Sequence, residues 1–334
     1  MFNKIICIMR VSKKLKCAAI GFLAILSIQS TNAQGQTKSI NSLTSLLRRI
    51  KQSGYTNLDT TSGAGLFVKE KHSCTDTYKL YLQVIDLRKM HLINIYSITT
   101  NQGIAESKYY TQREFDSSPY FKRFSHQSVL DSIPANFRSR AFTILNAMFF
   151  EVYKDSTQFS FPVKDKGRVI SGGSSFYGPI ENAADNHYKN IALKAVLFSN
   201  AGVVIKDYNS KSGSPLNNPK YKTGFVTYNY LDHPARVLAN NQSNRYHLIG
   251  SVNVAETEGD ELLLILTIDR GTLDNAAKEL TDLGAGNQIA TIDGGSSVFI
   301  WNHRLGNVLV PESKEPTAMG YPVLIPHFIA FVKK

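Results

Sequence analysis

A carboxylate, two glycines and two serines stand together near the C-terminal end of the sequence. Residues 288–301 read QIATIDGGSSVFIW, so that Asp293 follows a short apolar run and is followed at once by Gly294, Gly295 and Ser296. Glycines let a backbone turn tightly or approach a ligand closely, and serine hydroxyls can bond sugar or phosphate oxygens. The pattern predicts either a site at a strand end or a plain β-hairpin, because Asp-Gly between apolar runs is also a strong hairpin signal.

The segment before this turn predicts the elements that would position it. Residues 261–268 form a near-continuous apolar run that ends on Asp269. Thr272 then suits the N-cap of a helix, and Gly284 suits its end. A buried strand, a helix and a second buried strand make a βαβ unit, whose strands normally run parallel through a right-handed crossover. We therefore expect Asp269 and Asp293 at one edge of the same sheet, where open α/β sheets usually bind ligands.

Three stretches together resemble the phosphodiester glycosidase domain family, the group that includes the enzyme uncovering mannose 6-phosphate on lysosomal proteins. GTLDNAAKELTDLGAGNQIATIDGGSS, at residues 271–297, is similar to the family's helix ending in Leu-Gly-Ala and its Asp-Gly-Gly-(Gly)-Ser turn. ILNAMFF at 144–150 resembles the family's Asn-Gly-Gly-Phe-Phe, and RYHLIG at 245–250 resembles its Arg-Thr-Ala-Ile-Gly. The likeness spans about residues 78–332. Four positions depart from the family pattern by substitution: Ala147, Met148, Tyr246 and His247.

The resemblance implies a hydrolase that cleaves a sugar 1-phosphodiester into a free sugar and a phosphomonoester. It implies that Asp293 faces the anomeric carbon or its water, with Asp269 as a weaker candidate for a second acid/base or supporting role. Arg245 would bind the phosphate, because its planar fork can hold two oxygens at once. Asn146 would bond a sugar hydroxyl or a phosphate oxygen, since its amide offers both a donor and an acceptor. The remaining candidate substrate contacts come from the turn itself: Gly294, Gly295 and Ser296.

Two other classes of function stay open. A non-catalytic protein that binds phosphorylated surface polysaccharide would keep the pocket without turnover, and the altered NAMFF motif favours it slightly. A phosphodiesterase that breaks the P–O bond would usually need a metal cluster, but the eight histidines show no metal-binding spacing and no HExxH occurs. No GxGxxG or GxxxxGK is present either. The sequence therefore requires no cofactor, although a divalent cation held by Asp293 or Asp269 with phosphate oxygens is compatible with it.

The first 33 residues have the order of a signal peptide. A basic segment is followed by an apolar run at residues 18–28, and Thr31-Asn32-Ala33 suits signal peptidase. Because the apolar run is too short to span a bilayer comfortably, we expect cleavage after Ala33, a secreted or periplasmic location, and no stable membrane insertion afterwards; an uncleaved anchor is the alternative. Cleavage would lower the formal charge from +12 to +7, because it would remove five basic residues, namely Lys4, Arg10, Lys13, Lys14 and Lys16.

The rest of the chain predicts a single α/β domain of the mixed α+β kind, with a mixed sheet and the βαβ unit near its C-terminus. Residues 34–75 are expected to form an N-terminal helical extension, because residues 39–52 place apolar side chains on one face. Residues 76–334 would form the glycosidase-like domain, with a pair of strands at 78–85 and 92–98. A strand at 141–145 would deliver Asn146 to its end.

The basic charge of the chain indicates the chemistry of its partner. On an exported protein, such charge favours anionic surface polymers or phosphorylated sugars. No nucleic-acid recognition motif is present, so we expect a phosphorylated glycan or a sugar-phosphate diester and not a nucleic acid.

Overall fold

The computed structural model describes residues 43–72, 77–100, 119–150, 156–173, 192–208, 215–237, 241–254, 261–312 and 323–334. All of them belong to one compact unit, residues 38–334. Within these ranges the strands form four sheets, and every strand pair is antiparallel. The predicted single domain of the mixed α+β kind is confirmed. The predicted signal peptide, residues 1–33, lies outside the described residues.

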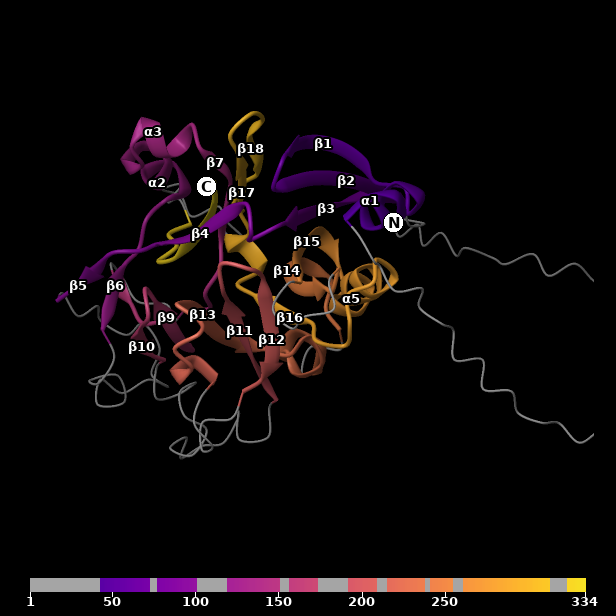
Figure 1. Ribbon diagram of the computed structural model, residues 1–334. Coiled ribbons are helices and arrows are strands. Elements are labelled where there is room, and N and C mark those ends of the chain that lie inside the picture. The colour runs from indigo at the N-terminus through magenta and orange to yellow at the C-terminus, as the bar shows by residue number, and fades with distance from the viewer. Residues whose placement is uncertain are drawn as a thin grey trace, which may run out of the picture. The chain divides into compact units, whose positions relative to one another are not determined.

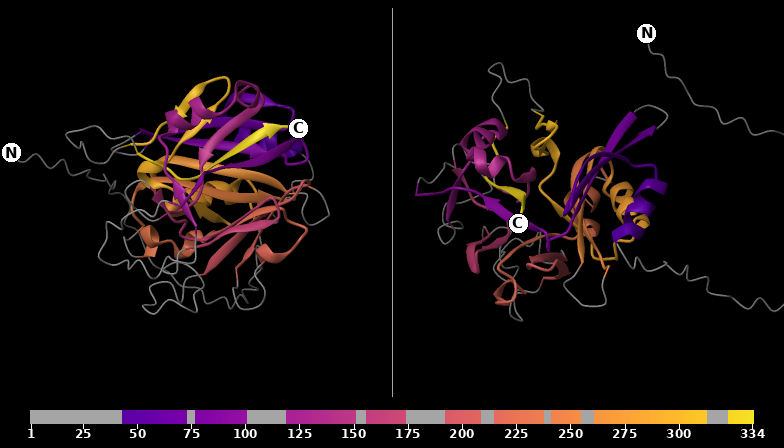
Figure 2. Two further views of the ribbon diagram at one scale, coloured as in Figure 1. Left: turned by 90° about the vertical axis from the view of Figure 1, so that its left-hand side faces the viewer. Right: turned by 45° about the horizontal axis from the view of Figure 1, so that its top comes forward.

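A six-stranded sheet carries the C-terminal motif. Its strands lie in the order β1 (Thr56–Thr61), β2 (Ala64–His72), β3 (Thr77–Ile85), β15 (Leu262–Gly271), β14 (Asn244–Val252) and β16 (Ala290–Ile292). Two helices, α1 (Leu43–Gln52) and α5 (Leu273–Asp282), lie on the same face of this sheet (Figures 1 and 2). Leu46 and Ile50 of α1 and Leu280 of α5 share one hydrophobic cluster with the side chains of that face. The amphipathic helix predicted at residues 39–52 is therefore present and packs on the domain.

The predicted βαβ unit consists of β15, α5 and β16. Thr272 caps α5, since its hydroxyl accepts a hydrogen bond from the Asn275 backbone N–H at 3.2 Å. β15 and β16 both pair antiparallel with β14, so they run in the same direction with β14 between them. β14 suits this inner position because residues 246–250 are all buried, which requires cover on both faces and on both edges.

The boundary expected after residue 75 does not separate two parts of the structure. Residues 34–75 supply α1, but the same segment also supplies β1 and β2, so it is not only a helical extension. β2 pairs with β3 along its whole length, from Ala64 opposite Ile85 to His72 opposite Thr77. The apolar residues Leu66 and Phe67 on β2 explain this, since each contributes to a hydrophobic cluster on one face of the sheet.

Two further sheets lie beside the first one. One of these two sheets has five strands in the order β18 (Gly306–Leu309), β17 (Ile300–Asn302), β7 (Ala141–Asn146), β19 (Phe328–Lys333) and β4 (Met90–Ile95). The strands predicted at 78–85 and 92–98 therefore exist as β3 and β4 but belong to different sheets. The second has the order β10 (Arg168–Gly172), β9 (Pro162–Asp165), β13 (Thr223–Tyr228), β11 (Leu193–Phe198) and β12 (Val203–Asp207).

The remaining elements are short. A three-stranded sheet joins β5 (Ile98–Thr99), β6 (Tyr120–Lys122) and β8 (Ser156–Thr157). The short helices are α2 (His126–Ser132), α3 (Ala135–Arg138) and α4 (Pro234–Val237), with 3₁₀ turns η3 (Pro215–Asn217), η4 (Tyr230–Asp232) and η5 (Gly295–Ser297). No helix in the part of the chain that the structure describes is long and apolar enough to cross a membrane.

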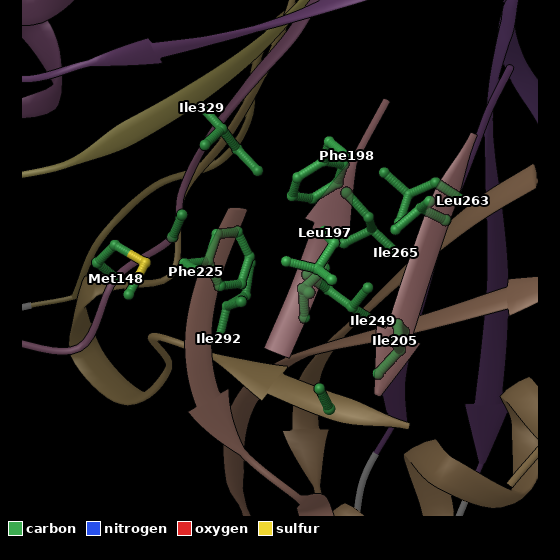
Figure 3. Close-up of a cluster of buried hydrophobic side chains, with 14 of the residues drawn as sticks. Met148, Leu197, Phe198, Ile205, Phe225, Ile249, Leu263, Ile265, Ile292 and Ile329 are labelled. Atoms are coloured by element: carbon green, nitrogen blue, oxygen red, sulfur yellow. The ribbon is translucent and has the colours of Figure 1, made fainter. Parts of the chain in front are cut away.

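One hydrophobic cluster joins the three large sheets. Ile265 and Ile292 come from the six-stranded sheet, Ile329 from β19, and Phe225 from β13 (Figure 3). These side chains come from strands far apart in the sequence. The turn after β16 therefore stands at the border of this shared core, where the sheets meet.

Candidate active site

Asp293 lies directly after β16 and is 7% exposed. Its backbone N–H donates to the Ala147 carbonyl, just beyond β7, at 2.8 Å. The chain then passes through η5 into β17, which pairs with β7 in a different sheet. The hairpin interpretation of the Asp-Gly pair is therefore wrong. The turn carries the chain from one sheet to another and leaves Asp293 between them.

Both glycines of the turn are required by its geometry. A Cβ on Gly294 would lie 3.0 Å from the Arg245 carbonyl oxygen, because the turn packs directly on the backbone of β14. Gly295 has a φ of 69°, in the left-handed region that favours glycine. Gly294 and Gly295, predicted as substrate contacts, thus have a structural role in shaping the turn.

The Asp293 carboxyl group is bonded by neutral donors. Its Oδ2 accepts from the Ser297 hydroxyl at 2.6 Å and from the Asn146 amide at 3.0 Å, and the Gly294 backbone N–H donates to the carboxyl group as well. Burial raises the pKa of Asp293 to about 7, and these hydrogen bonds only partly oppose that rise. A carboxyl group in this state can hold or release a proton near neutral pH, which suits acid/base chemistry.

A hydrogen-bonded chain holds Asn146 in place. Its Nδ2 donates to the Asp293 carboxyl group, so its Oδ1 is the acceptor, and the Phe299 backbone N–H donates to it at 2.8 Å. His247 Nε2 lies 2.9 Å from the same Oδ1 and must carry the ring proton. His247 Nδ1 then accepts from the Thr267 hydroxyl at 2.7 Å. Burial lowers the pKa of His247 to about 3, so the ring stays neutral and Asn146 has one orientation.

Arg245 lies on β14 two residues before His247, and its side chain is 12% exposed. Its Nη1 donates to the Val310 carbonyl at 2.7 Å, and its Nη2 forms an ion pair with Glu312. The Arg245 carbonyl faces Gly294, so Arg245 lies on the part of β14 against which the Asp293 turn packs.

Asp269 is separated from Asp293 by a strand. It lies within β15, on the other side of β14 from β16. Its Oδ1 accepts from the Lys79 backbone N–H at 2.7 Å. Burial raises the pKa of Asp269, while the Lys79 hydrogen bond and the charge of Arg245 oppose that rise. The structure thus brings Asn146 to Asp293 by a hydrogen bond and packs the Asp293 turn on the Arg245 backbone, while Asp269 interacts electrostatically with Arg245.

Several residues of this network were not predicted. Ser297, and not Ser296, bonds the Asp293 carboxyl group; the Ser296 carbonyl instead accepts from the Glu312 backbone N–H at 2.8 Å. The spacing of a serine four residues after Asp293 in a tight turn was the available signal. Thr267 has no sequence signal, because only the pairing of β14 with β15 sets it opposite His247.

A cavity of about 690 Å³ lies away from this network. It is lined mainly by α1, β1 and β2, and its apolar walls include Leu47, Ile50 and Phe67. Two of these side chains belong to the cluster on the helix-covered face of the sheet. Cavity volume therefore does not identify the candidate site. The polar network around Asp293 identifies it, because it holds the groups that suit acid/base chemistry. Among the residues that the structure describes, no three His, Cys, Asp or Glu side chains gather as metal ligands would.

The sequence matches no family model and no curated protein. Among solved structures, the auto-inhibited catalytic domain of zebrafish N-acetylglucosamine-1-phosphodiester α-N-acetylglucosaminidase has 10% identity and a TM-score of 0.50, with 84% of this chain and 88% of that chain covered. A hypothetical protein from Synechocystis has 10% identity and a TM-score of 0.45 over 84% of this chain, which spans only 64% of that protein's length. At such identities the likeness concerns the fold alone. The chain is therefore similar in fold to the zebrafish catalytic domain, as the three sequence motifs imply.

Proposed function

We propose that this protein hydrolyses a sugar 1-phosphodiester to a free sugar and a phosphomonoester. The observation that carries the proposal is the Asp293 carboxyl group, which is 7% exposed, bonded by neutral donors and raised in pKa to about 7. The fold likeness to a catalytic domain named for cleaving an N-acetylglucosamine 1-phosphodiester supports the choice of reaction. The three motifs that resemble the phosphodiester glycosidase family support it independently.

In the proposed reaction, water attacks the anomeric carbon. A bond forms between the water oxygen and that carbon, and the bond from the carbon to the phosphate oxygen breaks with its electron pair staying on the phosphate. The Asp293 carboxylate takes the proton of the attacking water and later returns it to solvent. A phosphomonoester is a better leaving group than an alcohol, so the reaction depends less on a general acid than ordinary glycoside hydrolysis does.

The other site residues have supporting roles in this proposal. Asn146 and Ser297 both donate hydrogen bonds to Oδ2 of Asp293. These bonds hold the carboxyl group in one orientation relative to the substrate. Arg245 binds the phosphate with its planar fork. Gly294, Gly295 and Ser296 give close contacts to the sugar or phosphate. Asp269 balances the charge of Arg245, in line with the electrostatic influence of Arg245 on the Asp269 pKa.

The proposal includes export of the chain and cleavage after Ala33. Intact mass spectrometry of protein recovered from outside the cytoplasm should give a chain that begins near Gln34. Full-length protein found only in the cytoplasm would contradict export and would leave the proposed chemistry untouched.

Hydrolysis in ¹⁸O-labelled water tests which bond breaks. The mature protein is incubated with a panel of sugar 1-phosphodiesters, with and without a chelator, and both products are weighed by mass spectrometry. We expect the label on the sugar and at least partial activity in the presence of the chelator. If a divalent cation assists through phosphate oxygens, its removal by the chelator would lower the activity. Label on the phosphomonoester would establish attack at phosphorus and overturn the proposal. Binding of the panel without any hydrolysis would favour the non-catalytic polysaccharide-binding protein.

A further inference from the structure

Residues 310–312, which follow β18, cross both Arg245 and the Asp293 turn; we call them the strap. The Val310 carbonyl accepts from Arg245 Nη1 at 2.7 Å, and Glu312 forms an ion pair with Arg245 Nη2. The Glu312 backbone N–H donates to the Ser296 carbonyl at 2.8 Å. One short segment therefore contacts the guanidinium and the turn that carries Asp293.

The two ends of this ion pair are unequal in exposure. The Arg245 side chain is 12% exposed, whereas the Glu312 side chain is 62% exposed. A carboxylate reaching in from solvent contributes little net stability, because water can solvate it as soon as it leaves. The guanidinium has no such alternative, since a sheltered cation needs an anionic partner. Glu312 is therefore the partner that can be exchanged, and Arg245 is the partner that must stay paired.

We propose that Glu312 is a specificity-determining residue: a built-in competitor that occupies the anion position on Arg245 until the phosphate of the substrate displaces it. The inference rests on the proposed function of this site. A phosphate oxygen can replace the carboxylate oxygen on Nη2 and keep the guanidinium paired. A neutral glycoside cannot, because its binding would either leave the carboxylate in place or leave Arg245 without its ion-pair partner. Glu312 thus excludes uncharged glycosides from the position that Arg245 offers.

The test compares phosphate binding by the unchanged protein and five variants. Glu312→Gln keeps the length of the side chain and an oxygen that can accept from Arg245, and it removes only the charge. Asp282→Asn is the matched control, because Asp282 pairs with Lys278 at 2.7 Å on the exposed side of α5 and its replacement changes the net charge equally. Arg245→Gln removes the proposed anion position. Isothermal titration calorimetry with inorganic phosphate at low ionic strength measures binding without any need for turnover.

Glu312→Gln should bind phosphate about threefold to fivefold more tightly than the unchanged protein, the gain that loss of one exposed competing carboxylate gives. Asp282→Asn should stay within about twofold of it, since the Asp282 carboxylate is exposed to water and pairs with Lys278 instead of Arg245. The gain should vanish when Glu312→Gln is combined with Arg245→Gln. A second variant, Glu312→Asp, shortens the reach of the carboxylate and should also tighten binding.

Equal or weaker phosphate binding by both Glu312 variants would overturn the inference, as would an equal gain in the control. No measurable phosphate binding by any of the proteins would overturn it as well. The proposed function is tested separately. Hydrolysis of a diester with unaltered phosphate affinity in the Glu312 variants would reject only the competitor role of Glu312. Tighter phosphate binding by these variants without hydrolysis of any diester would reject only the proposed enzymatic activity.

Discussion

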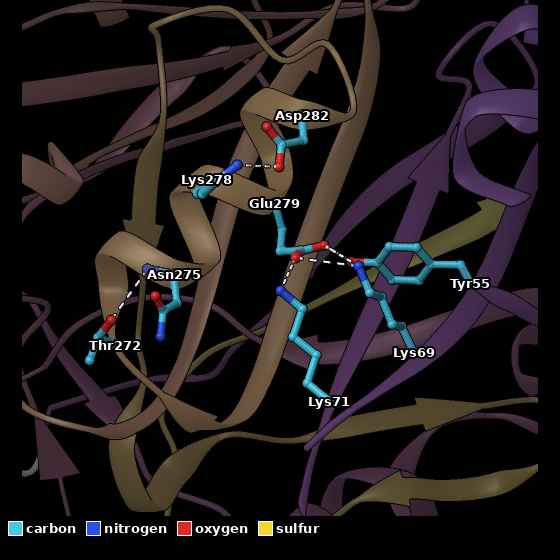
Figure 4. A network of polar contacts seen from close by, with 8 residues as sticks. All are labelled: Tyr55, Lys69, Lys71, Thr272, Asn275, Lys278, Glu279 and Asp282. Atoms are coloured by element: carbon cyan, nitrogen blue, oxygen red, sulfur yellow. Dashed lines mark hydrogen bonds and ion pairs between the residues drawn. The ribbon is translucent and has the colours of Figure 1, made fainter. Parts of the chain in front are cut away.

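Two buried carboxyl groups border the six-stranded sheet, and the groups that bond them differ in charge. Asp293 is bonded by a hydroxyl, an amide and a backbone N–H, all of them neutral. Glu279 on α5 is bonded by Lys69 at 3.0 Å and by Lys71, both from β2, and by the Tyr55 hydroxyl at 3.4 Å (Figure 4). The Glu279 side chain is 8% exposed and Asp293 is 7% exposed, so both carboxyl groups have little contact with solvent.

The charge of the partners decides the sign of the pKa shift. Burial raises the pKa of both groups. At Asp293 that effect prevails, because neutral donors oppose it only in part. At Glu279 the hydrogen bonds and charges of Lys71 and Lys69 outweigh it and leave the pKa below its usual value. Glu279 therefore stays ionised and joins α5 to β2, whereas Asp293 can exchange a proton.

The two groups also lie on different faces of the sheet. Glu279 belongs to α5, which covers the face that carries Leu80 and Leu266. His247 and Thr267, which extend the Asp293 network, alternate along their strands with residues of that cluster and so point to the opposite face. The helix-covered face is structural, and the opposite face, where the sheets meet, holds the polar chain that ends at Asp293.

The largest effect is expected from Asp293→Asn. It should lower kcat on the sugar 1-phosphodiester by about 100-fold to 10,000-fold, the range that a positioned acid/base group contributes. The melting temperature at pH 6 should change little, because the amide resembles the protonated carboxyl group in shape. Steady-state kinetics and thermal unfolding measure both, with Asp282→Asn as the control. A large drop in melting temperature with activity retained would make Asp293 a structural residue and end the comparison.

Glu279→Gln should give the reverse pattern. Its loss leaves Lys69 and Lys71 without their carboxylate, and we expect a loss of about 2 kcal/mol in the free energy of unfolding, below the usual cost of breaking a buried pair because both lysines are partly exposed. The kcat of the folded protein should be unchanged. Urea unfolding gives the first quantity and kinetics the second. Unaltered stability together with lost activity would contradict the assignment of Glu279 to structure.

His247→Ala tests whether the hydrogen-bonded chain positions Asn146. We expect a fall in kcat of about tenfold with an unchanged KM, because the variant loosens the group that orients Asp293 and contacts no substrate. His247→Gln should recover part of the loss, since its amide N–H can donate to Asn146 in place of Nε2–H. If instead KM rises while kcat stays constant, His247 contacts the substrate directly.

The pH dependence of stability should have opposite signs for the two groups. Folding raises the pKa of Asp293. Its contribution to the free energy of unfolding is therefore complete at pH values below its pKa in the unfolded chain, and it is lost as the pH rises through about 7. Relative to Asp293→Asn, the unchanged protein should lose about 1 kcal/mol between pH 6 and 8. The contribution of Glu279 is present at neutral pH and is lost as the pH falls, because folding lowers its pKa. Parallel curves for the two variants would refute the comparison.

Local patterns in the sequence predicted individual elements well. The cap at Thr272, the spacing of α5 and the strand that ends at Asn146 are all present. So is Asp293 at the end of a buried strand. Each of these depends on neighbours within a few residues, through periodicity, capping and turn chemistry, and such information is complete in the sequence.

The tertiary structure alone decided which elements meet. Apolar alternation indicates that a strand is covered but not which strand lies beside it, so neither β14 between β15 and β16 nor the separation of β3 from β4 could be deduced. The chemistry of the carboxyl groups follows from the same contacts. Asp269, Glu279 and Asp293 are alike as residues. Burial raises the pKa of Asp269 and of Asp293 more than their partners lower it, whereas two lysines from a distant part of the chain leave the pKa of Glu279 lowered.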